Sequence, residues 1–282
     1  MPDEIITTPA GTEDDPYLAT TWDELVAYAA EAGKYVKVAN DIDVLSEYPD
    51  GSAPTLVLNS YVDGDNKTIS RWYCTGQRYM ITTNNTTYIK NAIFTNIKTS
   101  WSLVYNVSDG NSDHITVQNC KFAGIMGDGF VFDGQNDTRS GKLDRITVNI
   151  KGSNLKLIFQ GGSAGFSNGN FNVKLKTSAS YLWDSRYYIN SSFYDSYFEL
   201  DAPDMTSMSN TSRYLYFNNC VLDITTDEET VINGGNSVLS IFNSTNAPHI
   251  NEIEGKIVGI EDVNWHNPTA LAEAGFNIVA GD

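Results

Sequence analysis

The sequence predicts an all-β chain that folds as a single-stranded parallel β-helix, a solenoid in which each coil of strands covers the coil before it. Three observations carry this prediction. The chain is rich in Asn, Gly, Ser, Thr and Tyr and poor in Lys, Glu and Leu, short apolar strands recur along it, and an Asn stands at the same place in successive copies. Helices are therefore expected only at the two ends of the chain.

The N-terminal residues predict an arm, a helix and a first strand. Residues 1–16 have no apolar periodicity and are expected to be an extended arm, either a frayed terminus or a segment that becomes ordered on a partner. Thr21 and Glu24 form a capping box that begins an amphipathic helix over about residues 21–33, and a glycine ends it. The alternating segment Tyr35–Val38 follows as a strand.

A repeated pattern dominates the rest of the chain. Each copy has a short apolar strand, an Asn or an acidic residue at a corner, and a second alternating strand. The copies align on Asn91, Asn119, Asn168, Asp195, Asn219 and Glu254, and a further copy lies at Arg145–Ile150. Irregular spacing is typical of a solenoid whose loops vary, whereas β-propeller blades have a more constant length. Because Asn tolerates the left-handed backbone conformation, we expect corner Asn side chains to form ladders between coils.

Both ends of a solenoid expose strand edges and an apolar interior, which promotes aggregation unless something covers them. The helix of residues 21–33 is placed to cover the first coil. Asn267-Pro268 begins and Gly275 ends a second short helix that would close the last coil. The predicted organisation is an extended arm (1–16), a parallel β-helix with its cap helix (17–266), and a C-terminal capping helix with a tail (267–282).

Composition excludes several classes of partner. With 35 acidic and 18 basic residues the formal net charge is −17, so nucleic acid and anionic membrane surfaces would be repelled. No apolar run is long enough to span a bilayer, and the first residues do not form a signal peptide. Cys74, Cys120 and Cys220 lie far apart and are expected to be buried thiols, neither zinc ligands nor disulfides.

The residues described so far resemble a known family. The helix start Thr21-Trp22-Asp23-Glu24-Leu25, the strand Tyr35–Val38 with the following Asn40-Asp41-Ile42-Asp43, and the repeated Ile-x-Asn-x-x-Phe coils are similar to right-handed parallel β-helix proteins of the pectate-lyase-like class. Within that class the resemblance is to the spike and appendage proteins of tailed bacteriophages. It covers roughly residues 17–260, and its motifs specify the fold far better than the function.

The resemblance implies a non-enzymatic virion structural protein: a head or tail appendage, spike, fibre or capsid decoration that presents its β-helix for attachment to host-surface glycans or for decoration of the particle. The N-terminal arm or cap would bind other virion proteins, and a homo-oligomer is implied, with a trimer favoured. The protein would be assembled in the host cytoplasm and located in the virion. The alternative is a polysaccharide-degrading hydrolase or lyase, a depolymerase of the same fold.

The catalytic sets of enzymes with this fold are not present. No Gly-His-Gly or Arg-x-Lys motif occurs, and the one Asp-Asp lies in the arm. A glycosidase needs only two carboxylates at a suitable separation, and the candidates are Asp128, Asp133 and Asp137, which could equally be turn residues. Residues 63–66 (Asp-Gly-Asp-Asn) resemble part of a calcium loop but lack its distal Glu, so a tight turn is predicted. No metal and no cofactor are expected.

Aromatic residues are the other candidates, because side chains at the same position of successive coils form a stripe on which sugar rings can stack. Packing in the core or between subunits would explain the same residues. The candidate glycan-binding residues are Trp72, Tyr73, Trp101, Tyr105, Trp183 and Tyr187.

Overall fold

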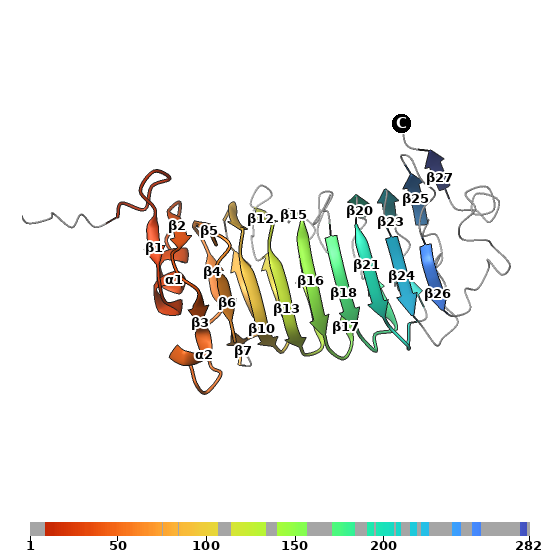
Figure 1. Ribbon diagram of the computed structural model, residues 1–282, viewed down its shortest axis with the longest axis horizontal. Helices are drawn as coiled ribbons and strands as arrows, with labels where there is room; N and C mark the ends of the chain where they lie inside the picture. Colours follow the sequence, from red (N-terminus) through yellow and green to blue (C-terminus); the bar gives the residue numbers. More distant parts are fainter. Residues whose placement is uncertain are drawn as a thin grey trace, which may run out of the picture.

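The computed structural model describes residues 9–74, 76–83, 85–106, 114–133, 140–156, 171–183, 191–194, 196–205, 207–209, 215–218, 221–225, 239–243, 250–254 and 277–280. Its strands stack one behind another into a rod, with the helices at the N-terminal end (Figure 1). Every pairing between named strands in these residues is parallel. The predicted parallel β-solenoid is therefore confirmed.

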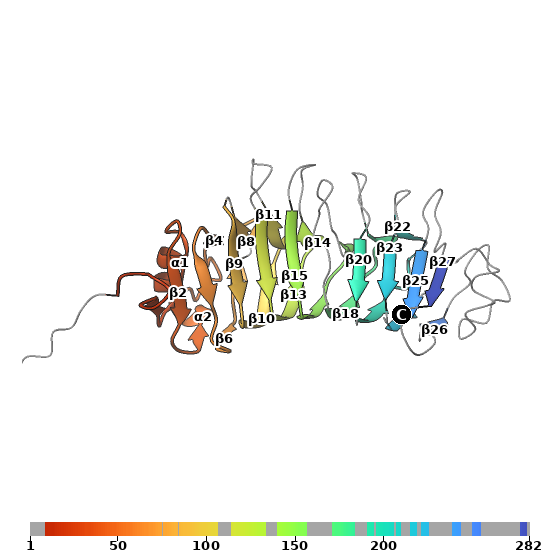
Figure 2. The ribbon, with the colours of Figure 1, turned by 90° about the horizontal axis from the view of Figure 1, so that it is seen from above.

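Three sheets run along the rod (Figure 2). Within each coil the chain turns at a corner from a strand of one sheet to a strand of the next. Sheet A contains β1 (Tyr17–Ala19), β2 (Tyr35–Val38), β5 (Tyr61–Asp63), β9 (Thr87–Lys90), β12 (His114–Gln118) and β15 (Ser140–Asp144). Sheet B contains β3 (Ile42–Asp43), β6 (Thr68–Ser70), β7 (Tyr73–Cys74), β10 (Ile93–Thr99), β13 (Lys121–Met126), β16 (Ile146–Lys151), β18 (Phe171–Lys176), β21 (Tyr197–Asp201), β24 (Val221–Thr225) and β26 (Ile250–Glu254). Sheet C contains β4 (Leu56–Leu58), β8 (Tyr79–Thr83), β11 (Ser102–Asn106), β14 (Gly129–Asp133) and β17 (Leu155–Lys156).

Two further sheets lie toward the C-terminal end. One pairs β19 (Tyr181–Trp183) with β22 (Ser207–Ser209). The other contains β20 (Ser191–Tyr194), β23 (Leu215–Asn218), β25 (Leu239–Asn243) and β27 (Asn277–Ala280). The predicted C-terminal helix over 267–275 lies outside the described residues. No helix in the described ranges is long and apolar enough to cross a membrane.

Asn residues form the predicted corners between sheets A and B. Asn91 and Asn119 have left-handed φ angles of 54° and 50°, and the Asn119 side-chain amide donates to Asn91 Oδ1 at 2.8 Å. Asn91 in turn donates to Asp63 Oδ1 at 3.0 Å, so the side chains form a ladder across three coils. The next corner is Arg145, also left-handed at 51°, which confirms the further copy of the repeat that begins there.

The repeat alignment is wrong at Glu254. In the described corners, the Asn lies two residues before the first residue of the sheet B strand, as Asn119 does before β13 and Asn91 before β10. Glu254 is instead the last residue of β26 (Ile250–Glu254) and pairs with Thr225 at the end of β24, so it does not occupy a corner position before its strand. Asn168, Asp195 and Asn219 lie outside the described residues.

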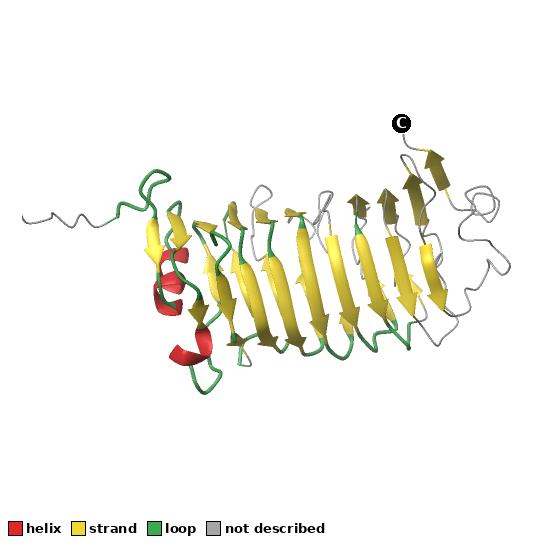
Figure 3. Cartoon of the chain, viewed as in Figure 1, coloured by secondary structure: helices red, strands yellow, loops and turns green. Residues whose placement is uncertain are grey.

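The predicted N-terminal helix is present as α1 (Trp22–Ala29) and is shorter than expected (Figure 3). Thr21 caps it by accepting from the Glu24 N–H at 3.2 Å. The Glu24 carboxylate accepts from the Thr20 hydroxyl and N–H at 2.7 and 2.8 Å, which lowers the pKa of Glu24. A second short helix, α2 (Val44–Glu47), was not predicted. Its Glu47 carboxylate accepts from the N–H groups of Trp22 and Asp23, which satisfies donors that the first turn of a helix otherwise leaves unpaired.

An aromatic column joins α1 to the coils. Trp22 packs on Trp72 at 4.5 Å between ring centroids, Trp72 on Phe94 at 5.9 Å, and Phe94 on Phe122 at 5.1 Å. All four side chains are buried in the main core. The amphipathic helix therefore covers the open end of the solenoid by continuing its internal stacking, as the sequence predicts.

The arm is attached to the first coil from Ala10 onward. The Tyr35 N–H donates to the Gly11 carbonyl at 3.0 Å, and Lys34 Nζ donates to the Ala10 carbonyl at 3.1 Å. A tight turn between Thr12 and Asp15 follows. The part of the predicted arm that the structure describes is thus folded back on β2 and is not extended.

Candidate functional site

A group of aromatic and charged residues lies at sheet C and includes two of the predicted glycan-binding residues. Trp101 immediately precedes β11, and Tyr105 lies within it. The backbone register pairs Tyr105 with Asp133 on the next coil, which was predicted as a catalytic carboxylate. Tyr105 and Asp133 are almost fully buried, whereas Trp101 is partly exposed.

Arg78 and Tyr79, which the sequence analysis missed, complete this group. The rings of Tyr79 and Tyr105 stack at 3.9 Å with an interplanar angle of 4°. The Arg78 guanidinium lies 5.3 Å from the centroid of the Tyr79 ring and 5.1 Å from that of Trp101. We call Arg78, Tyr79, Trp101, Tyr105 and Asp133 the sheet C cluster.

The electrostatics of the cluster keep the Tyr79 phenol protonated. Burial, with smaller contributions from Tyr105 and Asp133, raises the pKa of Tyr79 and outweighs the opposing effect of Arg78. A neutral phenol can both donate and accept a hydrogen bond. The cluster thus combines aromatic rings, a phenol, a cation and a carboxylate on three successive coils, those of β8, β11 and β14.

A second aromatic group borders the cluster on the C-terminal side. The Trp101 ring meets Phe130 edge to face at 5.7 Å. Lys156 Nζ lies over the rings of Phe130 and Tyr181, at 5.7 Å and 4.1 Å from their centroids, and donates to the Tyr181 hydroxyl at 2.7 Å. Aromatic and cationic side chains therefore continue along sheet C from β8 to β17 and reach Tyr181 in β19 of the neighbouring two-stranded sheet.

The other carboxylates predicted for catalysis do not join Asp133. Asp128 is exposed in the turn before β14, and Asp133 is the last residue of that strand. The intervening chain is extended, which places the two Cα atoms roughly 16 Å apart. Glycosidase carboxyl groups lie about 5 to 9.5 Å apart, so this pair does not have glycosidase geometry. Asp137 lies outside the described residues.

Trp72 and Tyr73, two of the remaining aromatic candidates, do not belong to the sheet C cluster. Trp72 is fully buried in the column beneath α1, so its ring contacts the core and presents no face to a ligand. Tyr73 is partly exposed in β7 and pairs with Lys98 on sheet B. Only the backbone of Trp183, in β19, is described, and Tyr187 lies outside the described residues.

Sheet A carries a tyrosine stack that the sequence analysis also missed. Tyr35, Tyr61 and Tyr88 pair in register on successive coils, with ring centroids 4.9 Å and 5.2 Å apart. Because these half-buried rings lie against one another, cross-strand packing accounts for them. The signal in the sequence is a Tyr at the same outward-facing position of three successive sheet A strands.

Residues 63–66 form the predicted tight turn. Asp65 and Asn66 both have left-handed φ angles, and the Lys67 N–H donates to the Gly64 carbonyl at 2.8 Å. The carboxylate of Asp63 lies 3.3 Å from Lys90 Nζ, so it is engaged in an ion pair. Within the described ranges, no three His, Cys, Asp or Glu residues are grouped to hold a metal ion.

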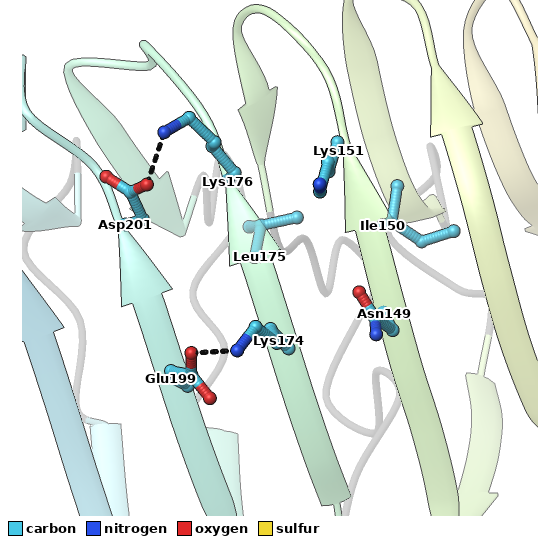
Figure 4. A pocket seen from close by; sticks show the side chains of 8 residues that line it. All are labelled: Asn149, Ile150, Lys151, Lys174, Leu175, Lys176, Glu199 and Asp201. Atoms are coloured by element: carbon cyan, nitrogen blue, oxygen red, sulfur yellow. Dashed lines mark hydrogen bonds and ion pairs between the residues drawn. The ribbon is translucent and has the colours of Figure 1, made fainter.

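A charged groove crosses the outer face of sheet B (Figure 4). Lys174 forms an ion pair with Glu199, and Lys176 forms one with Asp201 at 2.5 Å. These pairs link β18 to β21, and Lys151 on β16 lies beside Lys176 in register. All these side chains reach solvent, and such exposed pairs contribute little to stability.

Comparison with known proteins supports the fold alone. No family model matches the chain, and no curated protein matches it. A solved structure, described as a "putative immunoglobulin A1 protease" from Bacteroides ovatus, is similar with a TM-score of 0.51 and 11% sequence identity, over 93% of this chain and 89% of that one. At this identity the likeness concerns the fold and carries no activity across.

Proposed function

We propose that the protein is a non-enzymatic glycan-binding β-solenoid and that the sheet C cluster is its binding surface. The observation that carries the proposal is the meeting of Trp101, Tyr105 and Asp133 with Arg78 on adjacent coils. Sugars combine an apolar C–H face with a rim of hydroxyl groups. An aromatic ring suits the first, and charged or phenolic groups suit the second.

Each residue then has a definite role. The partly exposed Trp101 ring packs against the apolar face of a sugar. Arg78, whose guanidinium already lies over that ring, swings to donate to sugar hydroxyls. The stacked pair Tyr79 and Tyr105 forms the rigid floor of the site. The buried Asp133 lies beside Tyr105 in register and supports that floor from the next coil.

The non-enzymatic assignment rests on the carboxylate geometry. Both retaining and inverting glycosidases need a second carboxyl group within about 9.5 Å of the first. In the described part of the chain, Asp128 is too far from Asp133 to serve. We extend the proposal to a bacteriophage virion, as an appendage or decoration that attaches the particle to its host, on the strength of the sequence resemblance.

The binding proposal is tested with purified host-surface polysaccharides and isothermal titration calorimetry. Trp101→Ala and Arg78→Ala should each weaken binding by at least about tenfold, as expected for central contacts. Tyr61→Ala is the matched control, because it removes a half-buried aromatic ring from sheet A and should leave binding unchanged. Equal affinities for all three variants would refute the assignment of the site.

Two further measurements separate the alternatives. Release of new reducing ends from a polysaccharide, lost in Asp133→Asn, would establish a depolymerase in place of a binding protein. Electron microscopy of particles with antibody labelling tests the virion assignment. Protein that is found only free in the lysate would contradict it.

A further inference from the structure

The charge of sheet B changes sign along the rod. The strands β10, β13, β16 and β18 contain no Asp or Glu, and their lysines are Lys98, Lys121, Lys151, Lys174 and Lys176. The next three strands, β21, β24 and β26, contain no Lys or Arg, and their acidic residues are Glu199, Asp201, Asp223, Glu252 and Glu254. The seven consecutive strands from β10 to β26 thus have a basic half (β10 to β18) and an acidic half (β21 to β26), in a chain whose net charge is −17.

The backbone register aligns these residues in rows across the strands. One row runs from Lys174 to Glu199, Asp223 and Glu252, and another from Lys151 to Lys176 and Asp201. The two halves meet at the ion pairs between β18 and β21 (Figure 4). Among the described residues, Lys98, Lys121 and Lys151 form no ion pair, and Lys151 lies directly beside another lysine in register, which is unfavourable unless an anion approaches.

We propose that the outer face of sheet B is the interface of a two-fold dimer in which a second copy of the chain lies antiparallel on the first. With the axis at the boundary between β18 and β21, β16 of one copy opposes β24 of the other, and β13 opposes β26. A two-fold interface is self-complementary, since each contact occurs twice. An anionic polymer would be attracted to the basic half only and repelled by the acidic half, so charge complementarity favours a second copy.

The area of this face places the proposed dimer among weak interfaces. The six strands from β13 to β26 lie about 4.8 Å apart and are five or six residues long, so the face covers roughly 500 Å² per copy. A buried total of about 1,000 Å² is at the lower limit of specific interfaces. In the part of this face whose side chains the structure describes, the large hydrophobic side chain exposed to solvent is Ile125 on β13, at 58% exposure, and charged side chains outnumber it. The dimer is therefore weak, reversible and held mainly by charge.

The test is sedimentation velocity of the full chain over about 5 to 300 µM, at about 50 mM and about 500 mM NaCl. A dimer should form at low salt, with a dissociation constant that rises at least about tenfold at high salt because salt screens its charge pairs. Lys121→Glu with Lys151→Glu should abolish the dimer, as should Asp223→Lys with Glu252→Lys. Combining all four changes swaps the sign of facing residues and should restore it. Lys34→Glu with Lys37→Glu, which changes the net charge equally near sheet A, should leave it intact.

Three outcomes would overturn the proposal. One is a chain that stays monomeric at every concentration at low salt. Another is a dimer that resists both reversals or is not restored by their combination, with circular dichroism showing that the variants are folded. The third is a monomer whose retention on immobilised dextran sulfate is lost in the Lys121→Glu and Lys151→Glu variant, which would identify a polyanion as the occupant.

Discussion

Replacing Asn119 tests the corner that joins sheets A and B. Its backbone is left-handed at a φ of 50°, which costs most L-residues about 1 to 2 kcal/mol. Its side-chain amide also donates to Asn91 Oδ1 at 2.8 Å, an exposed bond worth about 0.5 to 1 kcal/mol. Alanine loses the bond and tolerates the backbone poorly, so Asn119→Ala should lower the free energy of unfolding by about 2 kcal/mol. Glycine adopts this backbone freely, so Asn119→Gly should cost about half as much.

Urea unfolding followed by circular dichroism measures both variants, with Asn172→Ala as the control. Asn172 is exposed in the middle of sheet B and does not have a left-handed backbone, so its replacement should cost less than about 0.5 kcal/mol. The reasoning fails if Asn119→Ala costs no more than this control. It also fails if Asn119→Gly is the more damaging change, because the left-handed backbone would then not be the main constraint.

Three more predictions concern the core, a buried thiol and pH. Trp72→Ala should destabilise the chain by about 3 to 5 kcal/mol in the same assay, because it empties the column between α1 and Phe94; a cost under about 1 kcal/mol would contradict the capping role of α1. Burial raises the pKa of Cys120 to about 12, so a thiol reagent at pH 8 should label it only after unfolding; rapid labelling of Cys120 in the native chain, located by peptide mapping, would be the contrary result. Burial alone would raise the pKa of Asp63, but hydrogen bonds from Asp65 and Asn91 and the Lys90 ammonium outweigh it and lower the pKa. The stability from Asp63 is thus present above its unfolded pKa of about 3.9 and lost as pH falls through the folded value, so Asp63→Asn should unfold more easily at pH 7 but differ little from the parent at pH 2. An equal difference at both pH values would refute this.

Much of the fold could be predicted because the backbone preferences of single residues determine where the coils turn. Asn91 and Asn119 occupy corners that require a left-handed residue, and Asn is among the few residues that accept this conformation and bond locally. Arg145 takes the equivalent corner without any such preference, so the sequence predicts that coil from its strand pattern and not from its corner residue. Where a corner is fixed by its neighbours on adjacent coils, its own residue type carries little signal.

The candidate site was predicted only in part because it depends on register between coils. Trp101, Tyr105 and Asp133 were each recognised by residue type, but their proximity depends on the pairing of β11 with β14. Loops of varying length separate the strands, so that register cannot be counted along the sequence. Tyr79 lies one coil before Tyr105, and only the stacking of the two coils reveals that their rings meet.

Strand alternation likewise does not say which face is internal. Trp72 and Tyr73 are adjacent and equally aromatic, yet Trp72 is fully buried and Tyr73 is partly exposed. The difference arises from α1, whose Trp22 packs on Trp72 at the end of the solenoid. A contact between a cap and a coil is a tertiary feature that no local pattern reports.

The structure of the chain in complex with a bound host-surface oligosaccharide tests the proposed function most directly. We predict a sugar ring packed on Trp101, with its hydroxyl groups within hydrogen-bond distance of Arg78. A saccharide bound instead along the tyrosine stack of sheet A, or in the charged groove of sheet B, would contradict it.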